Sequence, residues 1–305
     1  MADPKPKTGG SAPPHAADKG STLDDLERRT YQIIAFGFPL LTLVIITGSV
    51  WAQFAWGKYW QWDPKETASL VAWLIYAAYL HGRTSRGWRG STSAAFAVIG
   101  FLAVLFCFAG VNMLPGMHSY GRPAMGLAGL GGWEGMGPAE MMLTKAYLFV
   151  YVAALIAYVG AAVTKDKLLG RAATALTVAG LLAQTGAIAT RTVQAGRLPF
   201  TSGYDFAICF VWGIVLCYLV LEFIIKTRSI GAVAMALALL VNMYAYLWFP
   251  QKGVQPLPPA LQNRFWLHIH VALAIITYGA LALSCASGVM YFVVAWIEKP
   301  KRASA

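Results

Sequence analysis

Long apolar stretches separated by short polar segments make up most of this chain. A helix needs roughly 20 mainly apolar residues to cross the hydrocarbon core of a bilayer. Eight stretches approach that length, at about 31–53, 66–82, 92–114, 140–164, 171–190, 205–226, 229–249 and 266–296. Because lipid offers no partners for free backbone N–H and C=O groups, each stretch should be helical. The pattern predicts an all-α integral membrane protein with eight transmembrane helices.

The composition supports this prediction, because 58% of the 305 residues are hydrophobic and only 12% are charged. The first 29 residues differ: they are polar, rich in Pro, Gly, Ala and Lys, and lack the apolar core of a signal peptide. We therefore expect five units: a disordered tail (1–29), a half with three transmembrane helices (30–122), a Gly-rich external linker (123–139), a half with five transmembrane helices (140–298) and a cytoplasmic tail (299–305).

The formal net charge of +11 sets the expected orientation in the membrane. With the N-terminus in the cytoplasm, sixteen of the 24 Lys and Arg residues fall on the inner side and eight on the outer side. This is the bias that the positive-inside rule describes. The charge therefore indicates topology, and no nucleic-acid site is expected.

All four cysteines fall inside predicted spans: Cys107, Cys209, Cys217 and Cys285. No Cys-x-x-Cys pair and no paired loop cysteines are present, so neither a disulfide framework nor a zinc site is indicated. We expect these side chains to be small core residues.

A tryptophan-rich segment, "WGKYWQWDPKET", lies between the first two predicted spans. We call residues 56–63 the tryptophan loop; it contains Trp56, Trp60 and Trp62. An aromatic belt at the membrane interface is one interpretation, because Trp and Tyr gather there in general. The other is the wall of a ligand site, since a planar apolar macrocycle binds to aromatic and aliphatic surfaces.

The acidic residues that end this segment have an expected structural role. Asp63 precedes the next predicted helix, Pro64 would occupy its first turn and Glu66 follows three residues after Asp63. Asp is a favoured N-cap and Pro is favoured at the first helical position. We therefore expect Asp63 and Glu66 to orient the loop by capping that helix.

Three histidines lie where iron ligands could be placed. His118 in "PGMHSYG" and His270 in "WLHIHV" are both expected on the side of the tryptophan loop. Opposed imidazoles can hold haem iron from both faces. His268 and His270 point roughly 200° apart on a helix, and geometry alone does not choose between them. His81 is expected near the cytoplasmic face, either as a functional group or as a snorkelling side chain.

These residues together resemble a known family. "WGKYWQWDPKET", then "YLHGR", then "GVNMLPGMHSYG", resemble the CcsA (ResC) haem-handling proteins of system II cytochrome c biogenesis, whose tryptophan-rich (WWD) loop lies between two external histidines. "LPFTSGYDFAICFVW" (198–212) and "LPPALQNRFWLHIHVALAIITYGALAL" resemble segments that precede the loop in that family. The order therefore resembles a circular permutation, with 140–296 corresponding to the family's beginning and 23–122 to its end.

The resemblance implies a haem site on the external side of the cytoplasmic (inner) membrane. His118 and His270 would ligate the iron there, and His81 would be an inner haem ligand. The loop would lie alongside the haem through Trp56, Tyr59, Trp60, Trp62 and Asp63. The cofactor, transported as a substrate, would be haem b. The implied partners are a CcsB (ResB)-like membrane protein and an apocytochrome c with a Cys-x-x-Cys-His motif.

By resemblance, the chain would be part of a holocytochrome c synthase (a haem lyase). Its own residues would position haem, with no separate catalytic residue, because the nucleophilic thiols belong to the apocytochrome. Two other functions remain open on the sequence: a haem-carrying membrane subunit of an electron-transfer complex, and a haem exporter without ligation activity.

Overall fold

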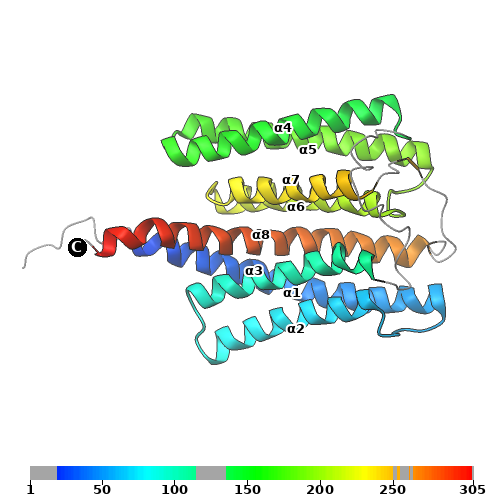
Figure 1. The fold of residues 1–305 in the computed structure, drawn as a ribbon, viewed down its shortest axis with the longest axis horizontal. Helices are drawn as coiled ribbons and strands as arrows, with labels where there is room; N and C mark the ends of the chain where they lie inside the picture. Colours follow the sequence, from blue (N-terminus) through cyan, green and yellow to red (C-terminus); the bar gives the residue numbers. More distant parts are fainter. Residues whose placement is uncertain (1–18, 115–134, 250–252, 255–260, 262–263, 304–305) are drawn as a thin grey trace, which may run out of the picture.

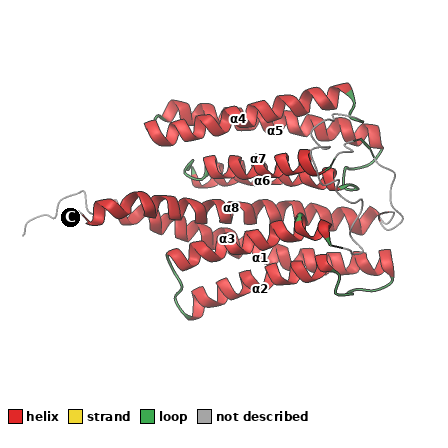
Figure 2. Ribbon diagram, in the orientation of Figure 1, coloured by secondary structure: helices red, strands yellow, loops and turns green. Residues whose placement is uncertain are grey.

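The computed structural model is built from helices alone in the residues that it describes, which are 19–114, 135–249, 253–254, 261 and 264–303 (Figures 1 and 2). The elements are α1 (Lys19–Trp56), α2 (Pro64–Ser85), α3 (Ser91–Phe108), the short 3-10 helix η1 (Gly110–Met113), α4 (Pro138–Thr164), α5 (Lys167–Ala195), α6 (Gly203–Ile225), α7 (Gly231–Trp248) and α8 (Arg264–Ala303). The predicted all-α class is confirmed.

The long helices run side by side in alternating directions (Figure 1). α1 packs along α8 and α4 along α5, while α6 contacts both α7 and α8. The first and last helices of the chain are therefore neighbours, and α8 joins α1–α3 to α4–α7. Helices α1, α5 and α7 end on the right of Figure 1, and α2, α4 and α6 end on the left.

Seven of the described helices are long and apolar enough to cross a membrane. The protein is accordingly a multi-pass membrane protein. The predicted span at 66–82 corresponds to α2, which is not among the seven because tyrosines, a histidine and charged residues interrupt its apolar run. With 22 residues, α2 is nevertheless about 33 Å long, and it lies beside α1 and α3.

Three helices extend past predicted segment boundaries. α1 begins at Lys19, so residues 19–29 are helical and not part of a disordered tail. This segment is ordered because it packs against α8: Leu26 is buried, and its carbonyl oxygen accepts a hydrogen bond from the Ser287 hydroxyl. At the other end of the chain, α8 continues to Ala303, through most of the expected cytoplasmic tail. α4 starts at Pro138, slightly inside the expected linker.

A buried ion cluster connects α4, α5 and α6 at the same end of the molecule as the tryptophan loop. The side chain of Arg191 is only 1% exposed, and its guanidinium pairs with Glu140 at 2.8 Å and with Asp205. Its Nη2 also donates to the carbonyl of Gly253, 3.3 Å away. Because a charge removed from water is costly unless it is paired, this cluster constrains how the three helices meet.

We predict that Arg191→Met destabilises the fold. The variant would leave the carboxylates of Glu140 and Asp205 buried without their common counter-charge, which typically costs about 3–5 kcal/mol. The measurement is the unfolding midpoint of the detergent-solubilised protein. Arg171→Met, on an exposed position of the same helix, is the matched control and should change the midpoint little. Equal midpoints for the two variants would contradict a constraining role for the cluster.

Candidate functional site

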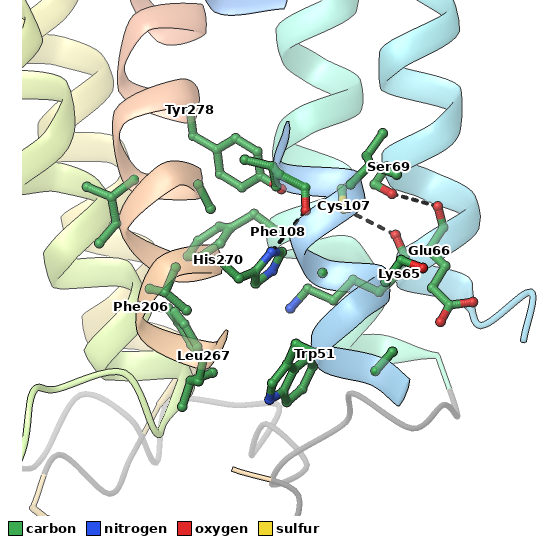
Figure 3. Close-up of a pocket in the computed structure, with 18 of the residues that line it drawn as sticks. Trp51, Lys65, Glu66, Ser69, Cys107, Phe108, Phe206, Leu267, His270 and Tyr278 are labelled. Carbon is green, nitrogen blue, oxygen red and sulfur yellow. Dashed lines mark hydrogen bonds between the residues drawn. The ribbon is translucent and has the colours of Figure 1, made fainter. Parts of the chain in front are cut away.

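A cavity of about 160 Å³ lies at the tryptophan-loop end, between α1, α2, α3, α6 and α8 (Figure 3). Roughly 10–15 Å³ on this measure holds one water molecule, so the cavity has room for an organic group. Its walls are mainly aromatic and aliphatic. The aromatic part is formed by Trp51, Tyr59, Trp60, Phe108, Phe206, Phe210, Phe249 and Tyr278.

His270 of α8 is the histidine that lines this cavity. Its Nδ1 lies 3.0 Å from the carbonyl oxygen of Val44 in α1. A carbonyl oxygen can only accept a hydrogen bond, so Nδ1 is the donor, and in the neutral ring Nε2 is then the nitrogen with the lone pair. Metal-binding histidines usually donate their second ring N–H in this way. The imidazole is therefore held in the tautomer that can bind iron through Nε2.

The position of the His270 ring depends on two residues of α1. Gly48 lets the ring approach closely, because a Cβ at that position would lie 2.8 Å from Cε1 of His270. The Trp51 ring is nearly parallel to the imidazole, with 7° between the planes and centroids 6.3 Å apart. α1 and α8 thus fix the imidazole by a hydrogen bond, a close approach and a stacked ring.

The tryptophan loop is fastened to the helices on both sides. The Ser49 hydroxyl of α1 donates to the carbonyl of Tyr59 at 2.9 Å. The Glu66 carboxylate of α2 accepts from the backbone N–H groups of Gln61 (2.8 Å) and Asp63 (3.2 Å). Asp63 caps α2, and its side chain with that of Glu66 completes a capping box. The capping expected from the sequence is confirmed.

The three tryptophans of the loop differ in their surroundings. Trp60 lines the cavity, and Trp62 packs edge-on against it with centroids 5.7 Å apart. Trp62 itself is 69% exposed and has φ of +58°, a left-handed conformation that is unfavourable for a bulky side chain. Trp56 packs against Trp51 at 4.9 Å. Only Trp60 of the three contributes directly to the cavity wall.

Of the residues predicted for the haem site, the structure places three on the cavity: Tyr59, Trp60 and His270. The others that it describes near this end, Trp56, Trp62 and Asp63, support or flank the loop. His118 lies outside the described residues. His268 packs edge-on against Phe200 at 5.8 Å, so the choice that helix geometry leaves open is resolved: His270, and not His268, faces the cavity.

His81 lies far from this cavity. It is in the last turns of α2 with an exposed side chain, roughly 22 Å along the helix from the turn that follows the loop. Its neighbour Arg83 pairs with Glu27 of α1 at 2.6 Å. The structure therefore brings His270 and the loop together and leaves His81 at the opposite end.

Several cavity residues were not predicted from the sequence, among them Trp51, Lys65, Cys107, Phe206 and Tyr278. Helical spacing could have identified some of them. Val44, Gly48 and Trp51 are spaced by four and three residues, as are Leu267, Val271 and Ala274, so each set lies on one helix face. These faces were indistinguishable from lipid-facing ones by hydropathy, because both are apolar.

Comparisons with known proteins concern the part of the chain that contains the tryptophan loop. The family model described as cytochrome c assembly protein matches residues 13–118. The cytochrome c biogenesis protein CcsA of Nostoc punctiforme is 52% identical over 118 residues, 38% of this chain and 33% of that protein. CcsA of Rippkaea orientalis is 57% identical over 99 residues, 32% of this chain and 29% of that protein.

The matched part thus spans about a third of the length of these curated relatives. No solved structure matches the chain. Trp60, Lys65 and Trp51 lie in the matched part, whereas His270 and Phe206 lie outside it. The cavity is therefore formed by matched and unmatched segments together.

We predict that Gly48→Ala disturbs the site through His270. The added methyl would meet the imidazole at 2.8 Å, and overpacking of this kind typically costs about 1–3 kcal/mol. The double variant Gly48→Ala/His270→Ala lacks the imidazole that the new methyl would meet. Its loss of stability should therefore be smaller than the sum of the losses in the two single variants. Unfolding midpoints measure this coupling.

Gly186→Ala in α5 is the control, because its methyl would meet only the flexible Leu143 side chain, at 3.3 Å. Strict additivity of the Gly48 and His270 substitutions would refute the close approach.

Proposed function

We propose that this protein handles haem at the membrane and presents it for attachment to apocytochrome c, a function supported by the match of residues 13–118 to the cytochrome c assembly protein model. The observation that carries the proposal is His270, an imidazole held by the Val44 carbonyl in an aromatic cavity beside the tryptophan loop. Haem is the cargo and substrate here. A planar apolar macrocycle matches these walls, and iron matches the free Nε2.

We assign the iron ligands as His270 and His118. His270 is supported by its tautomer and by its position on the cavity. His118 ends the segment that matches the family. Two such imidazoles on opposite faces of haem would hold it until the acceptor replaces one of them.

In the proposed reaction, each thiol of the apocytochrome's Cys-x-x-Cys-His motif adds across one haem vinyl group. The sulfur bonds to one vinyl carbon and the thiol proton is transferred to the other, so no further oxidant or reductant is consumed. The residues of this chain bind and orient haem, and the fixed imidazole and loop reduce the freedom lost in reaching that geometry.

His81 is proposed as an entry ligand for haem b from the cytoplasmic side. Its exposed side chain at the far end of α2 supports this role, because a partner subunit could supply the second ligand. A CcsB (ResB)-like membrane protein is the proposed partner. Two alternatives use the same cavity: a subunit that keeps its haem for electron transfer, and an exporter that releases haem without attaching it.

We also propose that the tryptophan loop faces the outside of the cytoplasmic membrane. The sixteen-to-eight excess of basic residues on the opposite side supports this orientation.

Cysteine labelling of intact cells tests the orientation. Lys58→Cys, exposed in the loop, should react with a membrane-impermeant maleimide added from outside. Arg86→Cys, exposed at the opposite end, should react only after permeabilisation. The wild-type chain is the control for its own cysteines, three of which are buried and one partly buried. The reverse pattern would invert the topology.

Co-expression with the proposed partner and an apocytochrome c tests the function. The full-length wild-type chain should yield a cytochrome whose haem stain survives denaturing electrophoresis. His270→Gly should lose most of the bound haem, or shift its absorption, and most of the covalent product, because one iron ligand is gone. Added imidazole should restore part of both. His268→Gly, on the other face of the same helix, is the matched control and should resemble the wild type.

The remaining outcomes separate the alternatives. Stable haem in the purified protein without covalent product would favour the electron-transfer subunit, and haem released outside without product would favour the exporter. Unchanged haem spectra and product in His270→Gly would overturn the proposed ligand. In the same assay, His81→Ala should leave the protein folded with less haem in the outer site; full occupancy would leave His81 as a snorkelling side chain.

A further inference from the structure

Lys65 is the cation of the cavity wall, and the proposed ligation chemistry does not use it. It is the second residue of α2, and its side chain extends across the cavity toward His270 (Figure 3). Its backbone is fixed on both sides: the N–H donates to Asp63 Oδ2 at 3.0 Å, and the carbonyl accepts from the Cys107 thiol at 3.5 Å. The cap of α2 therefore fixes the backbone position from which the side chain starts.

The described residues provide no ion pair for this ammonium. Within the described part of the chain, none of the carboxylates lies within ion-pair distance of the Lys65 Nζ. The nearby Glu66 carboxylate accepts from two backbone N–H groups of the loop. The Lys65 ammonium instead lies 5.9 Å from the centroid of the Phe206 ring.

A cation held among apolar walls is energetically unfavourable until an anion joins it. We propose that Lys65 binds a carboxylate of the molecule that occupies the cavity. This rests on the proposed function, under which that carboxylate is a haem propionate. Each part of haem has a chemically suitable partner in the cavity: the apolar ring system faces the aromatic walls, the iron binds His270 and a propionate carboxylate pairs with Lys65.

This contact would set which edge of haem faces α2. Propionates and vinyl groups lie on opposite edges of the macrocycle, so a propionate at Lys65 directs the vinyl edge away from α2. Lys65 thereby selects one orientation out of those that the iron ligand alone permits, since rotation about the His270–iron bond leaves that bond intact. The apocytochrome thiols then meet the vinyl groups in a defined place.

The other role open to Lys65 is structural. Its aliphatic stem and ammonium could simply cover Phe206 through a cation–π contact, with no contact to the ligand. The two roles differ in what they predict for ligands with and without free carboxylates.

The experiment compares two ligands on the purified full-length chain in detergent: ferric haem and its dimethyl ester, whose carboxylates carry no charge. The wild type should bind haem about tenfold more tightly than the ester, a typical advantage for one charge-assisted contact. In Lys65→Met the ratio should fall to about one with ester affinity unchanged, and Lys65→Arg should keep most of the preference. Lys58→Met, at an exposed lysine of the adjacent tryptophan loop, is the charge-matched control and should behave as wild type.

Each other outcome is decisive. A wild type that binds both ligands equally, or a Lys65→Met variant that keeps the preference, overturns the Lys65 assignment and leaves the haem cavity standing. A wild type that binds neither ligand overturns the proposed function together with it. His270→Gly should shift the haem spectrum while keeping the preference, which separates iron ligation from carboxylate binding. If Lys65→Met does not fold, the wild-type and Lys65→Arg comparisons still decide, because the assignment requires the tenfold preference in both.

Discussion

The buried guanidinium of Arg191 is the interaction on which the far wall of the cavity depends. It pairs with Asp205, and the second oxygen of that carboxylate accepts the backbone N–H of Ser202 at the start of α6. The same turn carries Phe206 into the cavity. In a low-dielectric interior these charges cannot separate cheaply, so the first turn of α6 is fixed relative to α5, and a wall of the site is fixed with it.

The sequence predicts the helices and the cap of α2 because both are local. Apolar length identifies spans, and Asp63 with Glu66 identifies a helix start. The sequence pattern does not identify Trp51, Lys65 or Arg191 as important positions. Which face of a helix turns inward depends on the neighbouring helices, and in a membrane the lipid-facing side is as apolar as the core, so no amphipathic stripe marks it.

His268 and His270 also show that the inward-facing side of a helix depends on its neighbours. Helix geometry establishes that only one of them can face a given point, but the choice requires knowing that α8 packs against α1 where Gly48 leaves space. The site is assembled from two distant parts of the chain, with His270 from α8 and the tryptophan loop from the α1–α2 connection. Its assembly therefore requires the α1–α8 pair, whichever part comes first along the chain.

The length of α8 links the two ends of the molecule mechanically. Its 40 residues extend about 60 Å, twice the roughly 30 Å of a hydrocarbon core. α8 projects beyond the other helices at the end opposite the cavity (Figure 1). No proline interrupts it before Pro300, whereas α1 contains Pro39. An uninterrupted helix is stiff along its length. A tilt imposed by a protein bound to the projecting end of α8 would therefore also move the His270 imidazole near the other end.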